Sequence, residues 1–295
     1  MPSTPPIEEP QGLRVSVVLV SFNQAAALRR AIQALERSRD RPRIEIVVAD
    51  CGSHDGCEAI DVEFPAVNML RLPHHVGAVR AMNIATRTAK ADLVLYLSPD
   101  VELEPATISA LADRLEADPG AIAACPLLVD PQGVPANRLY RLPDGAAMSA
   151  AAKGAELTRI QPDVAQETFS VDYPSLDALL VRKQFIRGMN YFDQRYGHYW
   201  GDADLAMQAR GANKKMYLYP SIRAIRHPET DPLQNEALAG SDRAVGAIAF
   251  IAKYEGAWPA LRLRLELAAG ALARMDFSRV AALLGGHKLD GSQAG

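Results

Sequence analysis

The stretch Asp92-Leu-Val-Leu-Tyr-Leu-Ser-Pro-Asp100 decides the fold. Residues 93–97 form an apolar run of strand length with no polar face, which is typical of a strand covered on both sides in an α/β sheet. Pro99 cannot continue a buried ladder of hydrogen bonds, so the strand ends there. The carboxylate of Asp100 therefore lies at the carboxyl edge of the sheet, where open α/β sheets bind ligands. From this stretch alone, Asp100 either binds a ligand or caps the helix that begins near Pro105.

The same alternation of strands and helices extends toward the N-terminus. Residues 15–20 are a nearly continuous β-branched run, and a helix capped by Asn23 follows them. Residues 43–49 form the next strand, so the three elements make a right-handed βαβ unit. A short strand at 68–72 and a helix at 77–90 then lead into the opening stretch. This order predicts an α/β fold with a mostly parallel twisted sheet flanked by helices. One face of each flanking helix is apolar: Ala27, Leu28, Ala31, Ile32 and Leu35; Val79, Met82 and Thr86; Ile108, Leu111, Ala112 and Leu115.

The pattern is less regular after residue 120. Residues 121–129 are strand-like, with Pro126 marking an edge or a bulge. Residues 130–166 are rich in Pro, Gly and Ala with little periodicity, and we expect a long mobile loop there. Residues 169–182 regain strand character, and two short strands are expected at 215–220 and 222–226. From residue 235 onward the chain is helical.

The last helices carry an apolar stripe, and its role has two interpretations. Packing on the protein's own core or on a dimer partner is the favoured one. The alternative is contact with a membrane that bears a lipid-linked acceptor. Six basic and three acidic residues between positions 253 and 288 give an excess too small to drive membrane binding alone. The stripe consists of Trp258, Leu261, Leu265, Ala268 and Leu272, with Arg262, Arg264 and Arg274 off that face.

Composition limits the class of protein. With 295 residues, 48% of them hydrophobic and 23% charged, the chain is expected to be a soluble globular protein of one large or two smaller domains. A net charge of -3 argues against a broad nucleic-acid surface. Cys51, Cys57 and Cys125 lack zinc-site spacing and are expected to be reduced thiols in a cytoplasm. Residues 1–12, proline-rich and acidic without a signal pattern, are predicted to be a disordered tail.

Two further stretches carry groups that could perform chemistry. The loop Asp50-Cys-Gly-Ser-His-Asp-Gly56 supplies two carboxylates after a strand and would suit a base or ribose, although Asp, Ser and Gly also make plain turns. Asp202 and Asp204 follow the aromatic run 196–200 and begin a helix. They either complement the helix dipole or include a general base, with the aromatic side chains excluding water. His227 matters only if folding brings it to Asp100.

Four stretches in this order resemble the inverting family-two glycosyltransferases of the GT-A fold, especially their rhamnosyltransferase-like branch. Residues 17–23 are similar to the family's opening strand with its V-T-Y-N end, and 47–56 to V-V-D-N-G-S-x-D-G. Residues 77–83 followed by 95–100 are similar to N-x-G and L-N-P-D. Residues 192–205, with 217–220 and His227 after them, are similar to G-F-D-E and E-D-V-D-L. The resemblance covers roughly residues 14 to 228.

The resemblance implies a GT-A domain at 13–230, a C-terminal helical extension at 231–295 and a role for individual residues. The protein would move a sugar from a nucleotide-diphosphate sugar to a hydroxyl acceptor, with inversion. Asp202 would be the general base, and Mg²⁺ or Mn²⁺ would be held by Asp100 and His227. Asn23 and Asp50 would hold the nucleotide, with Asp50 on its base, and a second set of residues would lie on the acceptor side. The nucleotide-sugar residues are Asn23, Asp50, Asp55, Gly77, Asn83, Ser98 and Asp100; the acceptor-side residues are Asp177, Trp200 and Asp204.

The chain departs from the family pattern at several positions. Ser98 replaces the first acidic residue of the DXD motif, and Gly201 stands where Glu usually precedes the catalytic Asp. Leu176-Asp177 replaces a Gly-Ala pair, and Arg80 enters a stretch of small residues. The alternative function is therefore a catalytically degenerate nucleotide-sugar-binding protein or scaffold in a polysaccharide pathway. A nucleotidyltransferase would need a glycine-rich basic loop that residues 21–26 do not provide.

The resemblance also implies partners and a location. The acceptor would be a saccharide or lipid-linked precursor of a polysaccharide or glycolipid of the cell envelope, and no nucleic acid is expected. The protein would be cytoplasmic, with peripheral contact at the inner face of the membrane or a homodimer through the C-terminal helices as further expectations.

Overall fold

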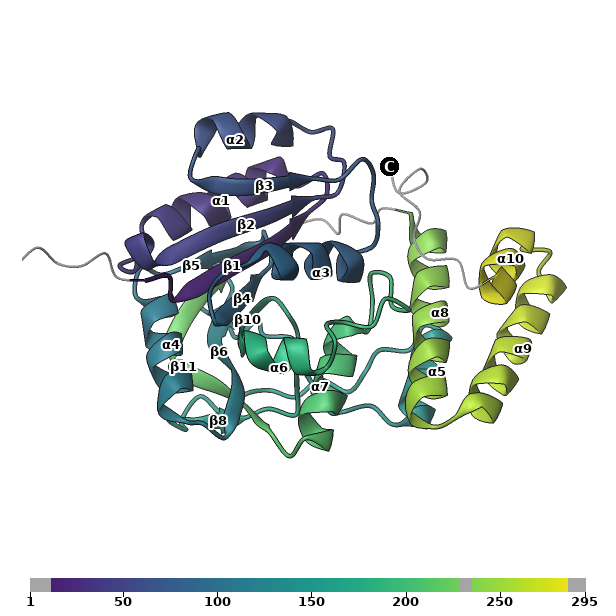
Figure 1. Cartoon of the computed structure of the whole chain (residues 1–295). Helices are drawn as coiled ribbons and strands as arrows, with labels where there is room; N and C mark the ends of the chain where they lie inside the picture. The colour runs from purple at the N-terminus through teal and green to yellow at the C-terminus, as the bar shows by residue number, and fades with distance from the viewer. Residues whose placement is uncertain (1–11, 229–234, 286–295) are drawn as a thin grey trace, which may run out of the picture.

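The computed structural model describes residues 12–228 and 235–285 of the chain. Within them, a nine-stranded mixed sheet in the order β3-β2-β1-β4-β10-β6-β11-β5, with β8 paired to β11, is covered by helices on both faces (Figure 1). The predicted α/β architecture is confirmed. The expected disordered tail falls, apart from Gly12, outside the described residues.

Four parallel strands form the half of the sheet that the N-terminal part of the chain builds. Every residue of β4 is buried, as its unbroken apolar run predicts. The connecting helices bury the faces expected from the sequence on the two sides of this sheet, with Met82 only partly buried. The elements are β1 (Val15–Ser21), α1 (Ala25–Glu36), β2 (Ile44–Asp50), α2 (Ile60–Glu63), β3 (Val67–Arg71), α3 (Ala78–Thr88) and β4 (Leu93–Leu97).

The other half of the sheet is mixed. Strand β10 pairs antiparallel with both β4 and β6, so it enters the sheet against the direction of its neighbours. The two short strands expected at 215–226 are one strand, β11, with a register shift between Tyr219 and Arg223. These elements are β5 (Val101–Leu103), α4 (Thr107–Ala117), β6 (Ala121–Val129), β8 (Phe169–Ser170), β10 (Ala178–Arg182), α6 (Lys183–Gly188), α7 (Gly201–Gly211) and β11 (Lys215–Arg226).

The long loop expected at 130–166 is in part ordered, so that prediction is wrong in its simplest form. Helix α5 (Gly145–Ala152) begins at Asp144, whose side chain accepts a hydrogen bond from Ala147 N–H. It buries Met148 and packs along α8 (Figure 1). Strand β7 (Leu139–Tyr140) pairs with β9 (Tyr173–Pro174) in a separate small sheet. Almost every side chain of α5 is apolar or small, so its sequence shows no clear alternation of apolar and polar residues at helical spacing, and the helix was not predicted.

The three C-terminal helices stand beside the sheet (Figure 1). They are α8 (Glu236–Tyr254), α9 (Ala257–Ala273) and α10 (Phe277–Gly285). Helix α8 packs on α5 and joins the main core, and α9 lies on α8. Packing on the protein's own core, the first half of the favoured interpretation of the apolar stripe, is wrong for four of its five residues: only Ala268 is buried, while Trp258, Leu261, Leu265 and Leu272 are exposed. Packing on a dimer partner stays a prediction. No helix in the part of the chain described by the structure is long and apolar enough to cross a membrane.

Candidate active site

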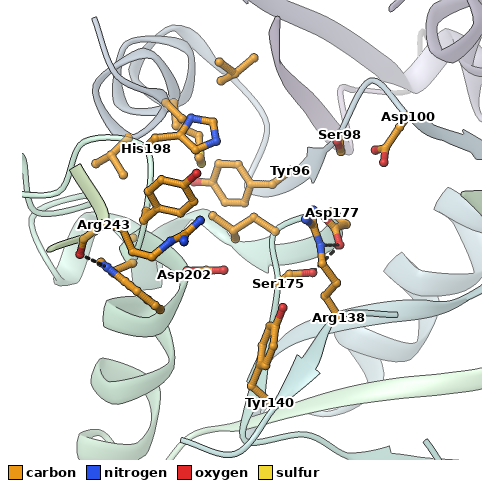
Figure 2. A pocket seen from close by; sticks show the side chains of 18 of the residues that line it. Tyr96, Ser98, Asp100, Arg138, Tyr140, Ser175, Asp177, His198, Asp202 and Arg243 are labelled. Carbon is orange, nitrogen blue, oxygen red and sulfur yellow. Dashed lines mark hydrogen bonds and ion pairs between the residues drawn. The ribbon is translucent and has the colours of Figure 1, made fainter. Parts of the chain in front are cut away.

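A pocket of about 600 Å³ opens at the carboxyl ends of β1 and β4. Its wall combines the end of β4, the segment before β10, the start of α7 and one residue of α8. Figure 2 shows Ser98 and Asp100 on one side of the pocket and Asp202 and Arg243 on the other. Of the predicted site residues, the pocket brings together Ser98, Asp100, Asp177, Trp200 and Asp202.

Asp100 lies at the end of β4 as the opening sequence stretch predicts. Its Oδ2 accepts a hydrogen bond of 3.0 Å from Arg226 Nε. Its Oδ1 is buried, and no hydrogen-bond partner for it lies within the described residues. A buried carboxylate oxygen without a donor is costly unless something charged or polar binds it. The free oxygen therefore fits a hard divalent cation, which commonly takes one or two protein carboxylates together with substrate phosphates.

Asp177 faces the same end of the pocket but is already paired. Arg138 holds both of its oxygens, Arg226 Nη1 lies 3.4 Å from Oδ2, and Ser175 donates to Oδ2 over 2.6 Å. Burial opposes the charge of Asp177, but these partners outweigh it and lower the pKa of the carboxyl to about 2. Asp177 therefore remains ionised and acts as a fixed anchor for two arginines.

His227 does not point at Asp100. Its backbone N–H donates to the Asp100 carbonyl over 2.9 Å, while its Nε2 lies 3.0 Å from Glu102 Oε2. Among the described residues, no group of three or more His, Cys, Asp or Glu side chains is placed to hold a metal ion. A role for His227 as a metal ligand would require its ring to leave Glu102.

Asp202 lies in the pocket at the second residue of α7, and its side chain is half-buried. Oδ1 accepts hydrogen bonds from Tyr173 Oη and from Ala203 N–H, each of 2.9 Å. Burial is the main cause that raises the pKa of Asp202, and the two hydrogen bonds act against it. No contact within the described residues engages Oδ2, so one oxygen of a carboxylate with raised proton affinity is left for a ligand.

Asp204 lies outside the pocket. Its fully buried carboxylate accepts two hydrogen bonds from Lys253 Nζ, of 2.7 and 2.9 Å, and one of 2.6 Å from Tyr254 Oη. These contacts fasten the end of α8 to α7. Its position does not support the predicted acceptor-side role, and the carboxylate is used for structure.

The aromatic run before α7 is fixed from two sides. Gly197 carbonyl accepts from Val79 N–H over 3.0 Å, and Asp242 of α8 accepts from His198 N–H over 2.8 Å. A Cβ on Gly197 would lie 1.9 Å from Asp242 Oδ1, so only glycine fits. Trp200 adopts a left-handed conformation with φ of 74°, and its Nε1 donates to the Arg243 carbonyl over 2.8 Å.

Gly201, where the family usually has Glu, also has a structural reason. A Cβ there would lie 2.7 Å from Val79 Cγ2 on α3. Gly201 and Val79 both line the pocket, and their close packing leaves no room for an acidic side chain at position 201. Arg80, the other unusual residue in this region, is exposed on α3 and does not line the pocket.

The contact between positions 201 and 79 predicts a measurable coupling. In urea denaturation, Val79→Ala should cost less stability when Gly201→Ala is present, because the smaller residue removes the clash that the new Cβ creates. We expect a coupling energy of about 1 kcal/mol or more from the double-mutant cycle. Additive effects of the two substitutions would show that the contact is absent.

Asn23, Asp50 and Asp55, which were predicted to bind the nucleotide, do not line the pocket. Asn23, which has φ of 51°, donates its N–H to Ser53 Oγ and accepts from His54 N–H, and Ser53 donates to Asp50 Oδ1. Asp55 Oδ2 accepts from Ala25 N–H over 2.6 Å. Asp55, rather than the expected Asn23, therefore caps α1. These bonds join the loops after β1 and β2.

Gly77 and Asn83 serve the packing around α3. Gly77 has φ of 89°, and a Cβ there would lie 3.2 Å from the Gly197 carbonyl oxygen. The buried Asn83 side chain accepts from Phe192 N–H and donates to its carbonyl. Both residues fix the loop that leads to Asp202, and neither lines the pocket.

Four functional candidates were missed from the sequence. Tyr173, Arg138, Arg226 and Arg243 all line the pocket. Arg138 falls in the segment expected to be a loop, and Arg243 lies in a helix assigned to the extension. Each acts through a partner distant in sequence, and no local pattern signals that.

The fold and site define a class of protein: glycosyltransferases with the GT-A fold, which use nucleotide sugars. Residues 16–171, just over half of the chain, match the model of glycosyl transferase family 2, so the chain belongs to that family.

Known proteins agree with this assignment. The chain is 27% identical over 237 residues to N-acetylglucosaminyl-diphospho-decaprenol L-rhamnosyltransferase of Mycobacterium tuberculosis (strain H37Rv), covering 72% of this chain and 75% of that one. It is also 27% identical over 105 residues to the uncharacterized glycosyltransferase YwdF of Bacillus subtilis (strain 168), covering 35% and 39%.

Two solved structures share the fold. One is GalNAc-T7 with UDP, GalNAc and Mn²⁺, with a TM-score of 0.59 and 16% identity, covering 74% of this chain and 44% of that one. The other is the mannosyltransferase PcManGT of Pyrobaculum calidifontis with GDP-Man and Mn²⁺, with a TM-score of 0.51 and 18% identity, covering 92% and 85%. At these identities the likeness concerns the fold alone.

Proposed function

We propose that this protein transfers a hexosyl group, with inversion, from a nucleotide-diphosphate sugar to a hydroxyl of a lipid-linked acceptor, with Asp202 as general base. The observation that carries the proposal is the free Oδ2 of Asp202, a carboxylate of raised pKa in the pocket that also holds Asp100. A general base needs a raised proton affinity and an oxygen within reach of the acceptor.

The reaction would need one proton acceptor and one centre for the leaving group. The acceptor hydroxyl gives its proton to Asp202 while its oxygen forms the bond to the anomeric carbon, and the bond from that carbon to the diphosphate oxygen breaks. Attack from the face opposite the diphosphate inverts the configuration. Tyr173 would orient Asp202 through the hydrogen bond to Oδ1.

The leaving diphosphate would lie near Asp100. The orphaned Oδ1 of Asp100 is the atom placed to bind Mg²⁺ or Mn²⁺ there. The metal, when bound, supplies positive charge to the departing diphosphate. Arg226 would hold Asp100 in position through Oδ2, and Ser98 would lie beside the sugar diphosphate. Nucleotide binding by Asn23, Asp50 and Asp55 is part of this proposal.

The acceptor class is inferred from the relatives. The mycobacterial relative is named for a diphospho-decaprenol acceptor, so a lipid-linked sugar of envelope polysaccharide synthesis is the acceptor we propose. The division into a catalytic domain at 13–230 and an extension at 231–295 stays a proposal, since Arg243 of that extension lines the pocket.

A panel of UDP-, dTDP- and GDP-sugars tests the function. Each is incubated with the protein, a short-chain lipid-linked N-acetylglucosaminyl diphosphate, and Mn²⁺, Mg²⁺ or a chelator, and nucleoside diphosphate release and the anomeric configuration of the product are measured. An inverted product from one donor with metal is the expected result. Metal-dependent donor binding without transfer would favour the degenerate binding protein. Absence of both would overturn the proposal.

We also propose that the C-terminal apolar face lies on an anionic membrane. This face comprises Trp258, Leu261, Leu265 and Leu272 of α9 with Phe277 and Leu284 of α10, all exposed. Residues 257–285, which form α9, α10 and the turn between them, carry four arginines and two acidic residues in a chain of net charge -3. One of the two, Glu266, is already paired with Lys153 at 2.6 Å. Basic charge beside exposed Trp and Leu is typical of interfacial helices.

Vesicle sedimentation tests the membrane contact. The double variant Leu265→Glu/Leu272→Glu should lower binding to phosphatidylglycerol vesicles at least about tenfold, because each leucine loses its burial in lipid and gains a repelled charge. Val62→Glu, at an even more exposed apolar residue on α2, is the control and should bind like wild type. Failure of the wild-type protein to sediment with vesicles would overturn the membrane contact. A wild-type dimer that the double variant disrupts would assign this face to a second copy instead.

A further inference from the structure

Arg243 is the pocket arginine whose charge is not used for structure. Of the four arginines that line the pocket, Arg138 and Arg226 are paired with Asp177 and Asp100. Arg159 is exposed at the rim. Arg243 is half-buried and makes no ion pair with any residue of 12–228 or 235–285. Its Cζ lies 4.6 Å from the centre of the Tyr199 ring.

The position of Arg243 is fixed by its neighbours. Its carbonyl accepts from Trp200 Nε1 over 2.8 Å, and the adjacent Asp242 accepts from His198 N–H. A Cβ on Gly246, one turn further along α8, would lie 2.7 Å from Trp200 Cδ1, so the helix and the aromatic run are in close contact. The guanidinium over Tyr199 is thereby held in place before any ligand binds, which reduces the entropy lost on binding.

Arg243 faces the half of the pocket where the acceptor would bind. Figure 2 shows its guanidinium on the side of Asp202, away from Ser98 and Asp100. The charges at the Asp100 end balance, because Asp100 and Asp177 face Arg138 and Arg226. At the Asp202 end, the Arg243 guanidinium makes no hydrogen bond or ion pair with a described residue. Its charge is therefore available to a ligand on the side of the base and away from the proposed metal ligand.

We propose that Arg243 binds a phosphate group of the acceptor, which makes the acceptor a sugar phosphate or diphosphate ester and not a neutral glycan. A planar guanidinium binds phosphate oxygens in pairs, and partial burial strengthens the contact. This inference rests on the proposed function and assigns an acceptor-recognition residue to it. The donor diphosphate is the other source of phosphate in the pocket, so the experiment separates the two.

The experiment compares wild type, Arg243→Gln, Arg243→Lys and Arg210→Gln. Arg210 is exposed near the end of α7, outside the pocket and away from the C-terminal apolar face, and serves as the matched control for loss of one positive charge. Each protein is assayed with a short-chain lipid diphosphate sugar and with the same sugar as a phosphate-free glycoside. Donor binding is followed by the Mn²⁺-dependent melting shift, and circular dichroism reports folding.

Arg243→Gln should lower kcat/KM roughly 10- to 100-fold for the phosphate acceptor, mainly through KM. The loss in kcat/KM for the glycoside should be smaller than that by a factor of about ten or more. Arg243→Lys, which keeps the charge, should recover part of the loss, and the donor-induced shift should persist. Equal losses with both acceptors, or a lost donor shift, would overturn the assignment to the acceptor phosphate. Wild-type protein that prefers the glycoside would overturn it while leaving the proposed function intact. Wild-type protein that transfers to neither acceptor would instead refute the proposed function.

Discussion

Asp202→Asn should lower turnover by about 100-fold or more while donor binding persists. Asparagine keeps the shape of the side chain, and its Oδ1 can still accept from Tyr173 and Ala203 N–H. It cannot accept the proton of the acceptor hydroxyl. The measurement is kcat with saturating donor and acceptor, together with the donor-induced melting shift as a test of an intact donor site.

Asp204→Asn is the matched control for this prediction. Asp204 begins the same helix but binds Lys253 and Tyr254, so its substitution should lower stability, while the protein that remains folded turns over. If Asp204→Asn lost turnover and Asp202→Asn did not, the two roles should be exchanged.

The raised pKa of Asp202 gives the same prediction a pH signature. Burial favours the protonated form of Asp202 and raises its pKa. As pH is lowered, kcat should therefore begin to fall at a higher pH than it would with an ordinary aspartate, whose pKa is about 3.9. The folded-state pKa lies above the unfolded one, so ionisation of Asp202 costs stability as pH rises through that range. Asp202→Asn should therefore melt at a higher temperature than wild type at neutral pH, and this gain should disappear in acid.

Asp100→Asn should abolish metal-dependent donor binding. The amide keeps an acceptor for Arg226 but removes the negative charge that the orphaned Oδ1 offers to a cation. With ligand at a hundred times its Kd, binding stabilises a protein by about 2.7 kcal/mol, and the variant should lose that increment. The measurement is the melting shift with nucleotide sugar and Mn²⁺.

Glu104→Gln controls for the loss of a carboxylate near this strand end. Glu104 is exposed and does not line the pocket, so its variant should keep the full shift. A shift in Asp100→Asn equal to that of wild type would mean that the metal is held elsewhere.

The N-terminal half of the fold could be predicted because its signals are local. An unbroken apolar strand that ends at Pro99 places Asp100 at the sheet edge, and a periodic helix between two such strands fixes their parallel pairing. The aromatic run before Asp202 likewise marked a loop at the site. Each of these signals lies within one continuous stretch of the sequence.

The other half of the pocket depends on contacts between distant segments. Arg138 meets Asp177 across 39 positions, and Asp242 reaches His198 across 44. Asn83 looked like a ligand residue, but its side chain is hydrogen-bonded to the backbone of Phe192. The sequence shows which groups can form hydrogen bonds, whereas the partner each group takes depends on the tertiary packing.

The attachment of α8 sets where this chain could be cut or joined in a hybrid enzyme. Its first half holds the aromatic run through Asp242, and its last turn holds α7 through Lys253 and Tyr254. A graft that exchanged the region before β10 would alter the donor end and leave these contacts whole. One that exchanged the acceptor end would have to carry α7 and α8 together from the same parent, with its junction after Tyr254. On the proposed role of Arg243, acceptor preference would be transferred by two helices, α7 and α8, that are separated in the chain by strand β11.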